Sequence, residues 1–169
     1  LLDDWMIRGE MSNALSKLFV RNLKNNEEEE LVFANEQVWN PSVSEIQKET
    51  NTDNVYISYS SPKTNLRAYI YNLRTKEKKF VKEQEVLDKN YSPKNYITER
   101  LECKSHDGKN IPLTITRHKE TKVDGTANVL LYGYGSYGNS LSFGFSNTRL
   151  SLLNRNIIWC DASVRGIVK

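Results

Sequence analysis

Short apolar runs separated by turn-forming residues dominate the first half of the chain. Residues 15–34 contain two such runs, and residues 55–82 contain three, at 55–59, 68–71 and 80–81. Runs of this length, rich in β-branched and aromatic residues and bounded by turn residues, are typical of β-strands. We therefore predict a strand hairpin in each segment. The acidic run at 27–30 is expected to be a solvent-exposed hairpin tip, because runs of like charge usually lie in water.

The two predicted hairpins resemble each other in sequence. Residues 19–24 (FVRNLK) match residues 69–74 (YIYNLR) in type, and Asn22 corresponds to Asn72, 50 positions further on. Internal similarity at this period indicates a repeat array, and all-strand units of this length fit the blades of a β-propeller. Two unrelated hairpins with a common turn would give the same pattern, and this alternative stays open.

The pattern changes after a linker that begins at Tyr91. A further hairpin is predicted over residues 98–116, around an Asp-Gly turn. Residues 129–132 then form a continuous apolar run, Ser146 is placed to cap a helix, and residues 157–160 form a second apolar run. The order strand, helix, strand predicts a βαβ unit in a parallel sheet, with strands covered on both faces.

The composition narrows the class of protein without indicating a function. Of the 169 residues, 38% are hydrophobic and 27% are charged, and the formal net charge is +3. So small a charge predicts neither a nucleic-acid partner nor a membrane partner, and no apolar run approaches the ~20 residues of a membrane helix. Only two cysteines are present, Cys103 and Cys160, and the N-terminal residues include Asp3 and Asp4, where a signal peptide would carry basic residues. We therefore expect a reducing, cytoplasmic setting.

Three glycines follow the apolar run at 129–132 and fit the pattern G-x-G-x-x-G. They are Gly133, Gly135 and Gly138, and Asp161 ends the next predicted strand. In this context the pattern is also the fingerprint of a dinucleotide-binding loop. A dinucleotide-binding module is therefore one hypothesis for the function.

Two features of the glycine loop favour another interpretation. Residues 139–145 separate the glycines from the predicted helix, whereas a pyrophosphate needs the helix to begin directly at the glycines. Tyr134 and Tyr137 also place bulky side chains where a pyrophosphate would approach the backbone. A tyrosine hydroxyl is a suitable donor to a developing oxyanion, and a loop of this kind builds the oxyanion hole in α/β-hydrolases. Tyrosines that only pack the loop remain the structural alternative.

Three segments resemble the prolyl oligopeptidase family of serine peptidases, and within it oligopeptidase B. They are residues 130–138 (LLYGYGSYG), 145–155 (FSNTRLSLLNR) and 164–166 (VRG). The resemblance implies a mixed fold, in which a seven-bladed β-propeller caps an α/β-hydrolase domain. Residues 1–90 would be the C-terminal part of the propeller. Residues 91–169 would be the first, incomplete βαβ part of the hydrolase domain, truncated before the nucleophile.

The resemblance also implies roles for three residues and a class of substrate. Tyr134 matches the family tyrosine whose hydroxyl helps to stabilise the oxyanion. Tyr137 matches the aromatic residue beside the S1 pocket, and Arg165, with Gly166, matches the start of an Arg-Gly-Gly loop. Members of the family hydrolyse short peptides, and oligopeptidase B cleaves after Arg or Lys. The family implies neither a cofactor nor a metal.

The rest of the catalytic machinery is not found in the sequence. No G-x-S-x-G motif is present, and Ser136 fails the pattern because Tyr134 stands two positions before it. Neither His106 nor His118 matches a family catalytic position. We therefore expect this chain alone to be inactive. A degraded or split gene product is a further hypothesis, with a downstream catalytic fragment as its partner.

Overall fold

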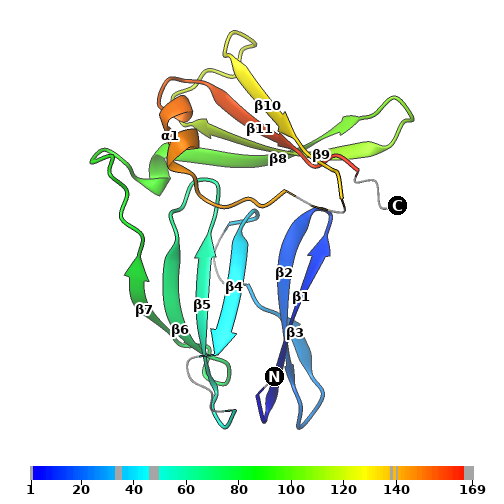
Figure 1. The fold of residues 1–169 in the computed structure, drawn as a ribbon, viewed down its shortest axis with the longest axis vertical. Coiled ribbons are helices and arrows are strands. Elements are labelled where there is room, and N and C mark those ends of the chain that lie inside the picture. Colours follow the sequence, from blue (N-terminus) through cyan, green and yellow to red (C-terminus); the bar gives the residue numbers. More distant parts are fainter. Residues whose placement is uncertain (1, 33–35, 46–49, 138, 140, 166–169) are drawn as a thin grey trace. The chain divides into compact units, whose positions relative to one another are not determined.

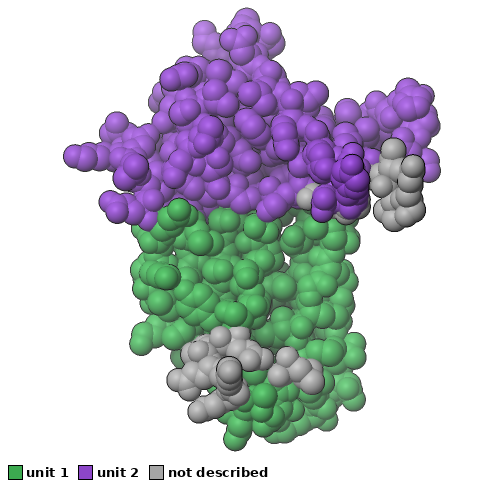
Figure 2. Space-filling view, in the orientation of Figure 1, with its two compact units in different colours: residues 1–61, 66–84 green, residues 62–65, 85–169 purple. Residues whose placement is uncertain are grey.

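A computed structural model describes residues 2–32, 36–45, 50–137, 139 and 141–165 (Figure 1). The described part contains three β-sheets and one α-helix. The chain forms two compact units (Figure 2), one of residues 1–61 and 66–84 and the other of residues 62–65 and 85–169.

The first unit contains two antiparallel sheets. A three-stranded sheet has the order β1-β2-β3 and a four-stranded sheet has the order β4-β5-β6-β7. Their strands are β1 (Trp5–Ser12), β2 (Leu15–Asn22), β3 (Glu28–Glu30), β4 (Asn40–Glu45), β5 (Asn54–Ser60), β6 (Arg67–Asn72) and β7 (Lys78–Glu83). Both predicted hairpins are present, as β2-β3 and as β5-β6-β7.

The two hairpins share the same turn geometry. In the first turn the N–H of Asn22 donates to the carbonyl of Glu27, and the N–H of Asn26 donates to the carbonyl of Asn22, both at 2.9 Å. The corresponding bonds from Asn72 and Lys76 in the second turn have the same length. Each asparagine side chain also accepts a bond from the N–H two residues further on. The sequence similarity therefore corresponds to a common turn structure, as both a repeat and two hairpins with a common turn predict.

The acidic run is exposed to solvent, as predicted, but the prediction that it forms a hairpin tip was wrong. Residues 28–30 form β3, which pairs with β2. Cations on the neighbouring strands explain the difference, because they neutralise the run across the sheet. Glu28 lies 2.7 Å from Arg8 and 3.0 Å from Arg21, and Glu30 lies 3.0 Å from Lys17.

Apolar side chains from both sheets build the core of the first unit. Alternate residues of β5, including Val55, Ile57 and Tyr59, pack in one cluster with Leu18 and Val20 of β2. Full burial of a side chain of this size is worth roughly 1.5–3 kcal/mol. The core therefore joins the two hairpins.

The second unit is a mixed sheet with one helix. Its sheet order is β10-β11-β9-β8, in which β10 and β11 are parallel and the other pairs are antiparallel. The elements are a short 3-10 helix (Pro93–Asn95), β8 (Tyr96–Lys104), β9 (Asn110–His118), β10 (Val129–Gly133), α1 (Asn147–Leu153) and β11 (Ile158–Ala162). The predicted βαβ unit is thus β10-α1-β11.

The helix begins and ends as the sequence indicates. The side chain of Ser146 accepts a hydrogen bond of 3.3 Å from the N–H of Arg149, as expected of an N-cap. Leu150 and Leu153 are buried in a cluster with Tyr96. Asn156, just after the helix, has a φ of 60°, a left-handed conformation that asparagine tolerates well. The helix is not long or apolar enough to cross a membrane, and neither is any other in the described part of the chain.

β10 departs from the prediction of a strand covered on both faces. It is the edge strand of its sheet, and all five of its residues are exposed. The strand β11 agrees with the prediction, because it lies between β10 and β9 and four of its five residues are buried. A continuous apolar run therefore identified both strands, but it did not distinguish a central position from an edge position.

Candidate functional site

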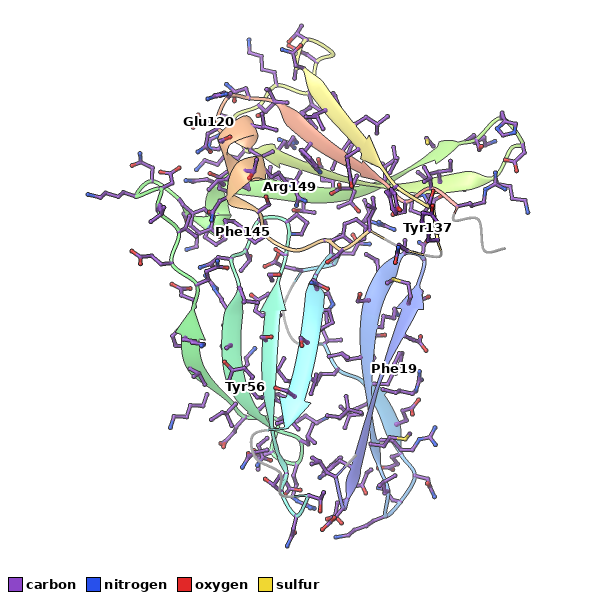
Figure 3. All side chains as sticks on the ribbon, viewed as in Figure 1. Phe19, Tyr56, Glu120, Tyr137, Phe145 and Arg149 are labelled. Atoms are coloured by element: carbon purple, nitrogen blue, oxygen red, sulfur yellow. The ribbon has the colours of Figure 1, made fainter. Side chains whose placement is uncertain are left out.

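The loop after β10 displays two tyrosines. Tyr134 is 41% exposed and Tyr137 is 89% exposed; Figure 3 labels Tyr137. The φ of Tyr137 is 57°, in the left-handed region that bulky residues rarely adopt. Conformations of this kind cost energy and cluster at functional sites. The backbone therefore holds an aromatic ring out of the protein at this loop.

Gly135 brings this loop against the segment that follows β11. A Cβ atom at position 135 would lie 2.8 Å from Cγ2 of Val164 and 3.0 Å from the carbonyl oxygen of Arg165. Only glycine allows so close an approach. The structure thus brings two segments with predicted site residues together. Gly138 and Gly166, which belong to the same predicted motifs, lie outside the described residues.

Arg165 makes an ion pair that the sequence did not suggest. Its Nη1 lies 2.7 Å from Oδ2 of Asp107, in the turn between β8 and β9. The hydrogen bond from Arg165 is the main cause that lowers the pKa of Asp107 below its ordinary value. The predicted substrate-binding arginine is therefore paired within the chain itself.

A buried charged cluster lies beside the loop and was missed at the sequence level. Nη2 of Arg149 lies 3.9 Å from Oδ2 of Asp161, and Nε1 of Trp159 donates to Oδ1 of the same aspartate at 2.7 Å. Burial raises the pKa of Asp161 and lowers the pKa of Arg149. The sequence held one signal, since helical spacing places Arg149 on the same face as Leu153, four positions further on. A charge on an apolar helix face is unusual enough to require a partner.

The remaining chemically active residues lie elsewhere. His106 lies in the β8-β9 turn beside Ser105, and the ring of His118 packs edge-on against Tyr96. Cys103 is exposed, and the other free cysteine is buried in β11. Among the described residues, no three His, Cys, Asp or Glu side chains gather into a set that could hold a metal ion.

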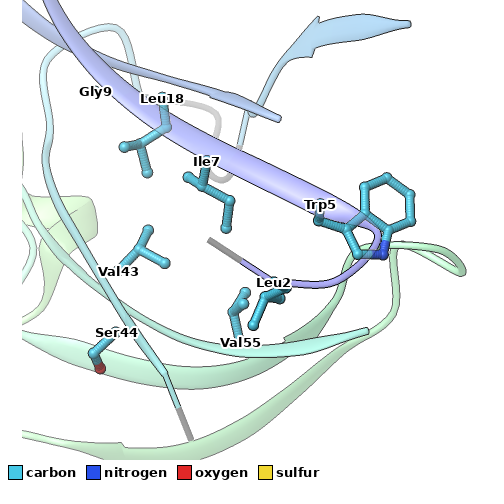
Figure 4. Close-up of a pocket in the computed structure, with 8 residues that line it drawn as sticks. All are labelled: Leu2, Trp5, Ile7, Gly9, Leu18, Val43, Ser44 and Val55. Carbon is cyan, nitrogen blue, oxygen red and sulfur yellow. The ribbon is translucent and has the colours of Figure 1, made fainter. Parts of the chain in front are cut away.

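The first unit has a hollow of about 480 Å³ between its two sheets (Figure 4). Its lining residues are Leu2, Trp5, Ile7, Gly9, Leu18, Val43, Ser44 and Val55. None of these carries a titratable side chain, so the hollow offers no acid, base or strong nucleophile for catalysis. The loop after β10 is therefore the better candidate site.

The geometry of the loop gives no support to dinucleotide binding. The helix α1 begins at Asn147 and is capped by the side chain of Ser146. The helix thus begins about twelve positions after Gly135, whereas a pyrophosphate-binding helix begins directly at the glycines.

Comparisons of the sequence and of the fold with known proteins both find peptidases. No family model matches the chain. The chain is 36% identical to dipeptidyl aminopeptidase BI of Pseudoxanthomonas mexicana over 167 residues, which are 98% of this chain and 22% of that protein. It is 33% identical to protease 2 of Moraxella lacunata over 116 residues, which are 69% of this chain and 17% of that protein.

Solved structures of oligopeptidase B share the fold. The enzyme from Trypanosoma brucei matches with a TM-score of 0.86 at 25% identity, and the one from Leishmania major with a TM-score of 0.85 at 24% identity. Each match covers 98% of this chain and 24% of the other, so the chain spans about a quarter of their length. The fold is thus of the mixed class, with β-propeller blades followed by the first βαβ part of an α/β-hydrolase domain. Its sequence and fold together show that the chain belongs to the prolyl oligopeptidase family of serine peptidases.

Proposed function

We propose that these residues are part of a serine oligopeptidase that hydrolyses short peptides, and that Tyr134 donates its hydroxyl to the oxyanion. The observation that carries the proposal is the packing of Gly135 on Val164 and Arg165, which fixes the backbone beside a tyrosine that is 41% exposed. An oxyanion donor is effective when it is held in place before the charge develops. A mobile loop would have to become ordered during the reaction, and the cost of that ordering would raise the activation barrier.

Tyr137 and Arg165 complete the proposed substrate site. The exposed ring of Tyr137 offers an apolar surface to a substrate side chain. Arg165 would offer its remaining N–H groups to a substrate carbonyl or carboxylate, because its contact with Asp107 uses Nη1 and its side chain is exposed. Cleavage after Arg or Lys is part of the proposal and rests on the likeness to oligopeptidase B.

We further propose that these 169 residues do not hydrolyse peptides alone. An acyl-enzyme requires a nucleophile, a base and an orienting acid in addition to the oxyanion hole. The sequence has no G-x-S-x-G motif to supply the nucleophile. The missing groups would come from a catalytic segment elsewhere in the same protein, or from a separate fragment in the case of a split gene. We also propose that the protein acts in the cytoplasm.

The exposed edge of β10 supports the need for further polypeptide. Val129 and Leu131 are 56% and 67% exposed, and among the described strands β10 pairs only with β11. An unpaired apolar edge strand is a template for another strand. We propose that a strand of the catalytic segment pairs with β10.

A burst experiment tests this proposal. An Arg-containing ester is mixed with the 169-residue chain and, separately, with the complete gene product that contains it. The proposal predicts a stoichiometric burst from the complete product and none from the chain. A burst from the chain would contradict the assignment of the nucleophile to another segment, and no burst from the complete product would contradict the peptidase function.

A further inference from the structure

The arm of the glycine-tyrosine loop that returns to α1, residues 141–146, is held by two arginines. Nη1 of Arg149 donates to the carbonyl of Gly144 at 3.1 Å. Phe143 is buried, and Cζ of Arg100 lies 5.8 Å from the centre of its ring. Figure 3 shows Arg149 on α1, next to Phe145 at the end of this arm. Polar and aromatic contacts therefore fix the arm at two successive residues.

Arg149 is itself held by β11. It lies 3.9 Å from Asp161, and its Cζ lies 5.0 Å from the ring of Trp159. Trp159 in turn donates to Asp161, so both partners of the arginine are locked to each other. Strand alternation places Trp159 and Asp161 on the same face of the sheet. The guanidinium thus has little freedom to leave the arm.

The register of the sheet connects this cluster to the start of the loop. Asp161 is paired with Tyr132 of β10 on one side and with Thr114 of β9 on the other. Thr114 accepts a hydrogen bond of 2.7 Å from Arg100, the second arginine at the arm. Across the sheet, one row therefore consists of Tyr132, Asp161, Thr114 and Arg100. It ends on β10 at Tyr132, two positions before the proposed oxyanion donor.

The Arg149–Asp161 pair is poorly built as a source of stability. Arg149 Nε and Asp161 Oδ2 are buried without a hydrogen-bond partner among the described residues, and the closest approach of the two charges is 3.9 Å. The attraction within a buried pair of such long separation does not offset the cost of removing both charges from water, and apolar replacements of such pairs are often neutral or stabilising. Stability alone therefore does not account for the presence of the pair.

We propose that Arg149, oriented by Asp161 and Trp159, is a positioning residue that fixes the returning arm of the loop and thereby the backbone of Tyr134. The end of β11 then anchors both ends of the loop: Gly135 packs on Val164, and the arm is tied to Asp161 through Arg149. The inference rests on the proposed function only for the role of Tyr134. The contacts by which Arg149 holds the arm, called the clamp below, can be tested without measuring enzymatic activity.

Hydrogen exchange in the full 169-residue chain tests the clamp. Arg149→Met keeps most of the apolar stem and removes the contacts to Gly144 and Asp161. We expect faster exchange at the end of the arm, at the amides of residues 149 and 150, which donate to the side chain and the carbonyl of Ser146. Their exchange should accelerate by at least about tenfold, as a local opening, while the amides of β8 and β9 keep their protection. Arg117→Met is the matched control, because Arg117 has a side-chain exposure of 12% against 10% for Arg149 and pairs with Glu99 in the same sheet, away from the loop.

Asp161→Asn provides a second variant if Arg149→Met does not fold. It keeps the oxygen that accepts from Trp159 and loses only the charge opposite Arg149. Faster exchange confined to the arm supports the clamp. Unchanged exchange in the arm, or equal acceleration in Arg117→Met, overturns it.

Kinetics of the complete gene product separate this inference from the proposed function. A positioning role predicts that Arg149→Met lowers kcat with little change in KM, whereas a merely structural role would lower the amount of folded enzyme and leave kcat per active site unchanged. Faster arm exchange with an unchanged kcat would keep the contact of Arg149 with the arm but contradict its positioning of Tyr134, whereas the role of Tyr134 itself depends on the kinetics of Tyr134→Phe. Unchanged arm exchange would contradict the clamp whatever the kinetics.

Discussion

Replacement of Gly135 by alanine should strain the candidate site more than the same replacement at Gly133. The new Cβ would lie 2.8 Å from Cγ2 of Val164, 3.0 Å from the carbonyl oxygen of Arg165 and 3.1 Å from that of Val164. Real Cβ atoms do not make contacts as short as the first of these. Either the loop or the segment after β11 must move.

The size of the destabilisation by Gly135→Ala depends on which neighbouring atoms can move away from the new methyl group. Val164 is partly exposed, so its side chain can rotate away from the new methyl group. The two carbonyl oxygens belong to the backbone and can move only with the whole segment. Overpacking of this kind costs about 1–3 kcal/mol. Gly133→Ala is the matched control, because its nearest contacts are 3.7 Å or longer, which is ordinary van der Waals separation.

Urea denaturation of the two variants measures the difference. Gly135→Ala should lower the free energy of unfolding of the second unit by about 1–3 kcal/mol relative to Gly133→Ala. Adding Val164→Ala should recover only part of the loss, because the carbonyl contacts remain. Equal stability of Gly135→Ala and Gly133→Ala would refute the close approach and, with it, the argument that the Tyr134 backbone is fixed.

Three further predictions concern the second unit. Leu153→Ala, at a side chain that is 1% exposed, should cost about 2–5 kcal/mol in urea denaturation, and a loss below 1 kcal/mol would contradict its place in the core. Burial raises the pKa of Asp161 above its ordinary 3.8, so this group stabilises the folded state most below that pH and loses its contribution as the pH rises through the folded pKa. The parent should therefore gain stability relative to Asp161→Asn as the pH falls from neutral towards about 4, and a difference independent of pH would contradict a buried carboxyl group. We expect copies of the chain to associate through the exposed edge strand β10, so Leu131→Lys, which places a charge there, should reduce the concentration-dependent light scattering. Val123→Lys, in a surface loop, should not reduce it, and equal effects of the two variants would contradict association through β10.

The local elements of the fold were predictable because their signals are short-range. The Asp-Gly turn, the Ser146 cap and the shared turn at Asn22 and Asn72 all depend on side chains that bond to the backbone within a few residues. These features were found where the sequence indicated. The exposure of β10 and the strand formed by residues 28–30 were not, because each depends on what lies across the sheet.

The candidate site was predictable in its residues and not in its contacts. The resemblance indicated Tyr134, Tyr137 and Arg165, and the roles of all three remain predictions. The pairing of Arg165 with Asp107 joins two distant segments, and no local pattern encodes it. The Arg149–Asp161 pair depends on how α1 lies on β11, and the sequence shows it only as a charge on an apolar helix face.

The kinetics of Tyr134→Phe in the complete gene product test the central claim most directly. Removal of an oxyanion donor costs about 10²–10³-fold in kcat, and the loss should appear with little change in KM because the interaction is made only in the transition state. Tyr132→Phe is the control, since this tyrosine lies two positions earlier on β10 and its ring packs near Trp159. The account predicts that only Tyr134→Phe shows the large loss of kcat, and equal rates for the two variants would contradict it.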